Sequence, residues 1–108
     1  MVRQSVFPRL VVRRKSHAGS RLLSASEWRE AAQFFRLSRI ELGVVKGIFD
    51  QLTAAQMGRK LRLAERTVRA YARRVRVKLR AERKHIVVLR VFTWFTNRDR
   101  RTEPPLIA

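Results

Sequence analysis

One short pattern occurs three times in this sequence and marks three helix starts. A Ser or Thr is followed three residues later by a Glu or Gln, in the pairs Ser24 and Glu27, Ser38 and Glu41, and Thr53 and Gln56. In such a capping box the hydroxyl accepts a hydrogen bond from a backbone N–H of the first turn, and the Glu or Gln side chain accepts one from the backbone N–H of the Ser or Thr. Helix starts this close together leave little room for strands, so we expect an all-α fold.

Apolar residues at helical spacing follow these starts and predict which side chains form the core. We expect inward-facing Trp28, Ala31, Ala32 and Phe35 in residues 24–36, Leu42, Val45, Ile48, Phe49 and Leu52 in and just after residues 38–51, Met57 and Leu61 in a short helix after Thr53, and Val68, Ala72, Val75 and Leu79 in residues 65–79. Gly43 and Gly47 lie on the other side of the second helix. Either a neighbouring backbone approaches them, or the helix tolerates each at a cost of about 1 kcal/mol.

Residues 81–95 form the last predicted helix and are apolar on nearly every side. A β-strand competes here, because Val, Ile, Phe and Trp favour strands. We expect a helix, since every preceding element is helical. A helix that is apolar all round must be covered on more than one side. One side can belong to the core of this domain, and a second copy of the chain would cover another.

Both ends of the chain are expected to be flexible. Residues 1–23 form a basic arm that contains no acidic residue, and such arms often become ordered only on contact with phosphate. Residues 96–108 include Pro104 and Pro105 and are interpreted as a flexible tail. Between them we expect an additional helix at 24–36 and a helical domain at 37–95.

The charge of the chain points to a polyanionic partner. Its 108 residues include 26 Lys and Arg against 8 Asp and Glu, a formal charge of +18. Such a balance favours nucleic acid or an anionic membrane surface. The longest apolar stretch, residues 85–95, contains Arg90 and is shorter than the about 20 residues that cross a bilayer. Nucleic acid is therefore the expected partner, and no membrane is.

Metal sites and catalysis find little support in the sequence. There is no cysteine, and the two histidines, His17 and His85, are far apart and lack acidic neighbours at ligand spacing. We expect no metal, no cofactor and no small-molecule substrate. The sequence also lacks a Ser/His/Asp arrangement, a glycine-rich phosphate loop and a plausible carboxylate pair. We therefore expect no catalytic residues and no enzyme.

The third and fourth predicted helices meet the physical demands of a helix-turn-helix motif. The first helix of the motif needs a small residue at the crossing point, and Gly58 supplies it between the apolar Met57 and Leu61. The turn needs one inward apolar residue, which is Leu63. The second helix needs another one turn in, which is Val68. The spacing thus predicts a helix-turn-helix.

The stretch 37–79 resembles the LuxR-type (GerE-like) helix-turn-helix domain without a gap. The matching residues are Leu37, Ser38, Glu41, Leu52, Thr53, Met57, Gly58, Leu61, Leu63, Thr67, Val68, Arg69, Lys78 and Leu79. Three positions depart from the family pattern: Arg62 replaces a turn Gly suited to left-handed backbone, Ala64 replaces a Ser or Thr cap, and Tyr71 replaces a His. Sigma-factor region 4 domains share much of this pattern.

The resemblance, extended to residue 95, implies a fold and a set of site residues. The fold is a LuxR-type four-helix domain, here with an extra N-terminal helix and a basic N-terminal arm. The recognition helix, residues 65–79, would lie in the major groove of double-stranded DNA. By matched position, base edges would be met by Arg69, Ala70 and Arg73, phosphates by Thr53, Arg66 and Thr67, and phosphates or solvent by Arg74, Arg76 and Lys78. A homodimer would form through the last helix, at Val88, Val91, Phe92 and Phe95.

We therefore expect a sequence-specific DNA-binding protein that regulates transcription in the bacterial cytoplasm, at the nucleoid. Family members often carry a receiver or ligand-sensing domain as well, for which 108 residues leave no room. Two alternatives stay open: an RNA-binding or ribosome-associated basic protein, and a sigma-like adaptor that contacts RNA polymerase. The helix-turn-helix spacing favours DNA, because RNA binding does not require it.

Overall fold

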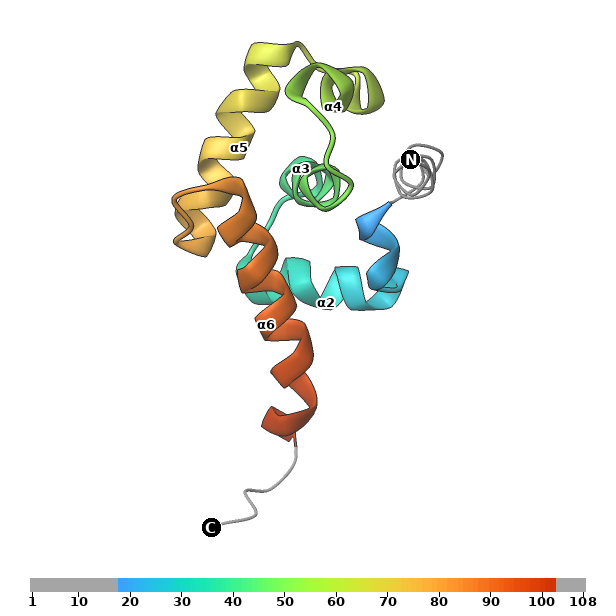
Figure 1. Ribbon diagram of the computed structural model, residues 1–108, viewed down its shortest axis with the longest axis vertical. Coiled ribbons are helices and arrows are strands. Elements are labelled where there is room, and N and C mark those ends of the chain that lie inside the picture. The colour runs from blue at the N-terminus through green and yellow to red at the C-terminus, as the bar shows by residue number, and fades with distance from the viewer. Residues whose placement is uncertain (1–17, 103–108) are drawn as a thin grey trace, which may run out of the picture.

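The computed structural model describes residues 18–102, and this part of the chain is helical throughout (Figure 1). The elements are the 3-10 helix η1 (Gly19–Leu22) and the α-helices α2 (Ala25–Phe35), α3 (Arg39–Phe49), α4 (Ala54–Leu61), α5 (Glu65–Leu79) and α6 (Lys84–Thr102). No strand occurs within the described range. The predicted all-α fold is confirmed, and the last apolar segment is a helix rather than a strand.

All three predicted capping boxes form, and they fix where α2, α3 and α4 begin. In each, the backbone N–H of the third helical residue donates to the hydroxyl oxygen over 3.1 Å, and the capping residue's own N–H donates to the Glu or Gln side chain over 2.8 Å. The start of α5 differs. Its capping position is Ala64, which makes no side-chain hydrogen bond, and a missing cap costs about 1 kcal/mol.

Three helices end on an arginine in left-handed backbone. Arg36, Arg62 and Arg80 follow α2, α4 and α5 with φ angles of 58°, 60° and 54°. At the position of Arg62 the family pattern has a glycine, which suits this conformation. Left-handed backbone brings Cβ close to the following carbonyl oxygen, which costs roughly 1–2 kcal/mol for residues other than glycine. These turns therefore keep the geometry of a glycine turn without its glycine.

Helix α3 is the centre of the structure. In Figure 1 it is seen end-on, with α2 below it, α4 above it and α5 and α6 to one side. Six valines from three helices are fully buried around it: Val44 and Val45 from α3, Val68 and Val75 from α5, and Val87 and Val91 from α6. Because these helices share one core, the orientation of α5 is set by α3.

Glycines allow the helix-turn-helix to close tightly. A Cβ on Gly58 would lie 2.6 Å from the carbonyl oxygen of Leu63, so the turn itself passes over this glycine. The Leu63 N–H donates to the Gly58 carbonyl over 2.8 Å at the same point. A Cβ on Gly47 would lie 2.6 Å from Met57 Sδ, and one on Gly43 2.8 Å from a methyl carbon of Leu61. Gly43 and Gly47 of α3 thus make room for side chains of α4, not for its backbone.

The expectation of a flexible arm up to residue 23 is wrong for its last six residues. The backbone N–H of Ser20 donates to Asp50 Oδ1 over 2.7 Å, and its hydroxyl bonds Oδ2 over 3.0 Å. The indole N–H of Trp28 donates to the Ser20 carbonyl over 2.8 Å, and Leu23 is buried. This segment therefore covers the end of α3. The rest of the predicted arm, residues 1–17, lies outside the described part.

The flexible tail expected at 96–108 is also wrong in part, because α6 continues to Thr102. Arg98 explains the extension. Its guanidinium lies 3.0 Å from Glu30 and 3.7 Å from Glu27 of α2. The same group stacks over the ring of Trp94 at 5.9 Å. These contacts join the last turns of α6 to α2, and residues 103–108 lie beyond the described range.

Helix α2 covers a side of α6 that the sequence assigned to a second copy. The Trp94 ring lies 6.0 Å from Phe34 and 6.2 Å from Phe35. Val91 is fully buried within the single chain, so its assignment to a dimer interface is wrong. The cause is that α6 packs against α2, α3 and α5 together, which leaves a narrower apolar side for any partner.

Candidate nucleic-acid interface

The packing of α5 turns its basic side outward. Val68, Val75 and Leu79 are buried against the core. On the opposite side, the exposed arginines are Arg66, Arg69, Arg73 and Arg74. Thr67 and Ala70, also predicted to contact DNA, are half-buried on the same helix. The structure thus brings the predicted recognition residues onto one helix with one open side.

Arg69 is held by an acidic neighbour one turn earlier. Its guanidinium donates to a carboxylate oxygen of Glu65, and both side chains are largely exposed. An exposed ion pair of this kind contributes about 0.3–0.5 kcal/mol, whereas a bidentate contact between arginine and guanine is worth about 1–3 kcal/mol. Glu65 therefore orients Arg69 without preventing a stronger contact.

Tyr71 and Arg74 form a stacked pair beside this side of the helix. The Arg74 guanidinium lies 5.0 Å from the centre of the Tyr71 ring. Tyr71 itself is half-buried and packs against the core. The ring thus supports Arg74 and limits the directions in which its charge can point.

Lys78, which was predicted to contact phosphate, makes two contacts inside the protein. Its Nζ donates to Glu41 Oε1 over 2.6 Å and to the carbonyl oxygen of Arg36 over 2.8 Å. The first contact ties the end of α5 to the start of α3, and the second satisfies the left-handed turn after α2. Lys78 therefore joins α5 to α2 and α3 in this structure, and its contact with phosphate stays a prediction.

Glu41 is the buried partner of that lysine. Its side chain is only 4% exposed, and it also accepts the Ser38 N–H of the capping box over 2.8 Å. Burial by itself would raise the pKa of Glu41. The hydrogen bonds from Lys78 and Ser38, with the positive charge of Lys78, outweigh burial and hold the pKa below its ordinary value of 4.5. The carboxylate is therefore stabilised in its charged form.

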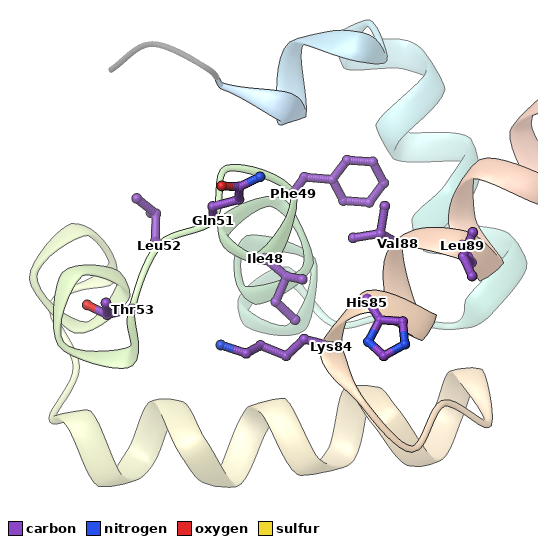
Figure 2. Close-up of a pocket in the computed structure, with 9 residues that line it drawn as sticks. All are labelled: Ile48, Phe49, Gln51, Leu52, Thr53, Lys84, His85, Val88 and Leu89. Carbon is purple, nitrogen blue, oxygen red and sulfur yellow. The ribbon is translucent and has the colours of Figure 1, made fainter. Parts of the chain in front are cut away.

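One cation that sequence reasoning did not place at the interface, Lys84, lies next to it. Arg76 and Lys84 line one hollow together with Arg69 and Arg73, and its volume is about 260 Å³. Lys84 belongs to the first turn of α6 and extends toward α4 in Figure 2. No local pattern marks this residue, because only the packing of α6 beside α5 brings it there. Thr53, at the start of α4, is exposed, and its hydroxyl oxygen accepts the Gln56 N–H.

A second, more apolar groove lies between the end of α3 and the start of α6 (Figure 2). Its volume is about 630 Å³, and its lining residues include Ile48, Leu52, Val88 and Leu89. Farther along α6, Phe92 is 42% exposed, while Leu89 is 55% exposed. Of the predicted dimer residues, Val88 and Phe95 are half-buried and Phe92 is exposed. Leu89 was not predicted.

Other kinds of site can be tested against the part of the chain that the structure describes. There, no three His, Cys, Asp or Glu side chains come together as metal ligands would. None of the described helices combines the length and the apolar character that a membrane span requires.

The fold and the outward basic helix define a helix-turn-helix domain of the DNA-binding class. Residues 36–91 match the GerE family, described as bacterial regulatory proteins of the luxR family. Because this match covers more than half of the 108 residues, the chain belongs to the LuxR family of DNA-binding transcriptional regulators. No curated protein and no solved structure matches it. The suspected resemblance is confirmed, and α2 lies outside the matched region.

The stability of the fold at acid pH tests the ion pair between Glu41 and Lys78. A carboxyl group whose pKa is lower in the folded than in the unfolded state stabilises the fold at any pH above its unfolded-state pKa. This stabilisation is lost as the pH falls through the folded-state pKa. For Glu41, this stabilisation begins to be lost below about pH 4.5. Glu41→Gln should therefore lower the free energy of unfolding at pH 7 and flatten its fall between about pH 5 and 3, measured by urea denaturation.

The matched control is Glu82→Gln, because Glu82 is exposed and makes no hydrogen bond or ion pair with the described residues. This variant should follow the wild-type curve. If Glu41→Gln and Glu82→Gln gave the same dependence of unfolding free energy on pH, the ion pair between Glu41 and Lys78 would not stabilise the fold.

Proposed function

We propose that this protein regulates transcription by binding specific sites in double-stranded DNA, with α5 in the major groove. One observation carries the proposal: Val68, Val75 and Leu79 hold α5 to the core, and its exposed arginines face away from it. A helix of about 10–12 Å diameter fits the major groove, which is about 12 Å wide. The chain's charge of +18 supplies the sequence-independent attraction to phosphate.

The outer residues of α5 divide into two roles in this proposal. Arg69 and Arg73 lie one turn apart and are both exposed. Each can donate two parallel hydrogen bonds to the O6 and N7 atoms of guanine. Ala70 lies between them and offers a methyl group to thymine. These three residues would therefore set the preferred sequence.

The flanking residues would position the protein on the sugar-phosphate backbone. Arg66 and Thr67 lie in the first turn of α5, where N–H groups lack partners within the helix. Thr53 caps α4 and keeps its hydroxyl hydrogen for donation. Arg74, stacked on Tyr71, is the fourth contact. Contacts of this kind fix register and orientation but carry no sequence information.

We also propose that two copies bind DNA together through the apolar side of α6. Leu89 and Phe92 are exposed there, and Leu89 also lines the groove that contains Ile48 and Leu52. A second copy offering the same residues would cover both surfaces around a two-fold axis. The protein would act at the bacterial nucleoid without catalysis. RNA and RNA polymerase remain alternative partners, and no described surface favours them over DNA.

Substitution of the two outer arginines tests the base-reading role. Arg69→Ala and Arg73→Ala should each weaken binding to a selected duplex by about 1–3 kcal/mol and relax its sequence preference. Binding to random duplex should change much less. Fluorescence anisotropy at fixed salt measures both. Arg29→Ala, which removes an exposed arginine of α2, is the control and should change neither.

Equal losses on selected and random duplex for both arginine variants would contradict base reading. Losses on selected duplex alone would support it.

Sedimentation tests the proposed dimer. The wild type should sediment at twice the chain mass, either free at micromolar concentration or on a duplex with two half-sites. Phe92→Glu places a charge on the proposed contact and should give the single-chain mass in both conditions while leaving the helical circular dichroism unchanged. A wild type that stays monomeric both free and on DNA would refute the dimer.

A further inference from the structure

We propose that Lys84 and Arg76 hold a DNA backbone phosphate in the hollow between α4, α5 and α6. This proposal rests on the proposed function and extends the interface beyond the helix-turn-helix to the start of α6. Lys84 is the important residue, because it belongs to α6, which follows the recognition helix and was predicted to pack and to form a dimer but not to contact DNA.

The composition of the hollow supports an anionic ligand. Four cationic side chains line it, Arg69, Arg73 and Arg76 from α5 and Lys84 from α6, and no acidic side chain is among its lining residues. The remaining lining residues are Ile48, Ala54, Met57, Val68 and Ala72, which are apolar. Like charges gathered over an apolar floor repel one another, and a bound anion relieves that repulsion.

Three of these four cations have no partner within the described part of the chain, whereas the fourth, Arg69, pairs with Glu65. The side chains of Arg73, Arg76 and Lys84 make no hydrogen bond or ion pair with the described residues. By contrast, Lys78 pairs with Glu41, and Arg98 pairs with Glu30. The cations that join helices are thus paired with acidic side chains, whereas Arg73, Arg76 and Lys84 are available to a ligand.

The position and chemistry of Lys84 favour phosphate over a base edge. Its stem passes close to Ile48, and its amine extends toward α4, as Figure 2 shows. A lysine acts as a compact point charge without the planar fork that reads guanine. The hollow extends from Arg69 and Arg73, the proposed base-reading residues of α5, to Lys84 of α6. A DNA strand that borders the major groove would therefore run past Lys84, between α4 and α6.

The salt dependence of binding tests this contact. Lys84→Ala should weaken binding to selected and random duplex alike, and should reduce the slope of log affinity against log salt by about 0.9, the value for one lost phosphate contact. Lys84→Arg should keep the slope. The control is Lys60→Ala, an exposed lysine of α4 that lines a different hollow beside α3. It should leave affinity and slope unchanged.

The outcomes separate this proposal from the proposed function. If the wild type binds no duplex, the proposed function fails first. If it binds duplex and Lys84→Ala keeps the wild-type slope, or loses affinity only for the selected sequence, the phosphate contact at Lys84 is refuted while DNA binding stands. Circular dichroism of each variant, expected to match the wild type because Lys84 is exposed, excludes unfolding as the cause.

Discussion

The packing of α5 against α3 is the contact on which the rest of the structure depends. Val68 and Val75 of α5 and Val44 and Val45 of α3 are all fully buried where the two helices pack together, which fixes the rotation of α5 about its own axis. A basic helix without such a stripe could turn any side toward a ligand. Here the buried valines leave one side outward, so that Arg69 and Arg73 can serve recognition and residues toward the core cannot.

Each end of α5 is held by a further contact, and the two contacts differ in their chemistry. At its start, the turn closes over Gly58, where a Cβ would meet the carbonyl oxygen of Leu63 at 2.6 Å. At its end, Lys78 reaches the buried carboxylate of Glu41. The close turn at Gly58 depends on the absence of a side chain there, and the contact of Lys78 depends on its ion pair with Glu41. Together they fix both ends of α5 against the rest of the domain.

Local patterns predicted most of the fold, and long-range contacts account for what they missed. Capping boxes and apolar spacing placed α2, α3, α4 and α5, because both act within a few residues. Nothing local signals that Lys78 meets Glu41 37 residues away, or that Ser20 meets Asp50 30 residues away. The same holds for Lys84, which reaches the candidate site only through the packing of α6. The family pattern therefore names candidate residues along α5 but none on α6 beside it.

The central claim is that α5 reads double-stranded DNA with its outward arginines. Selection from a random duplex library at moderate salt, with structured RNA as competitor, tests it most directly. The account predicts enrichment of duplexes that share guanines at fixed positions, arranged as two related half-sites if two copies bind. Retention of the RNA in preference to every duplex, or recovery of duplexes without a shared sequence, would contradict it.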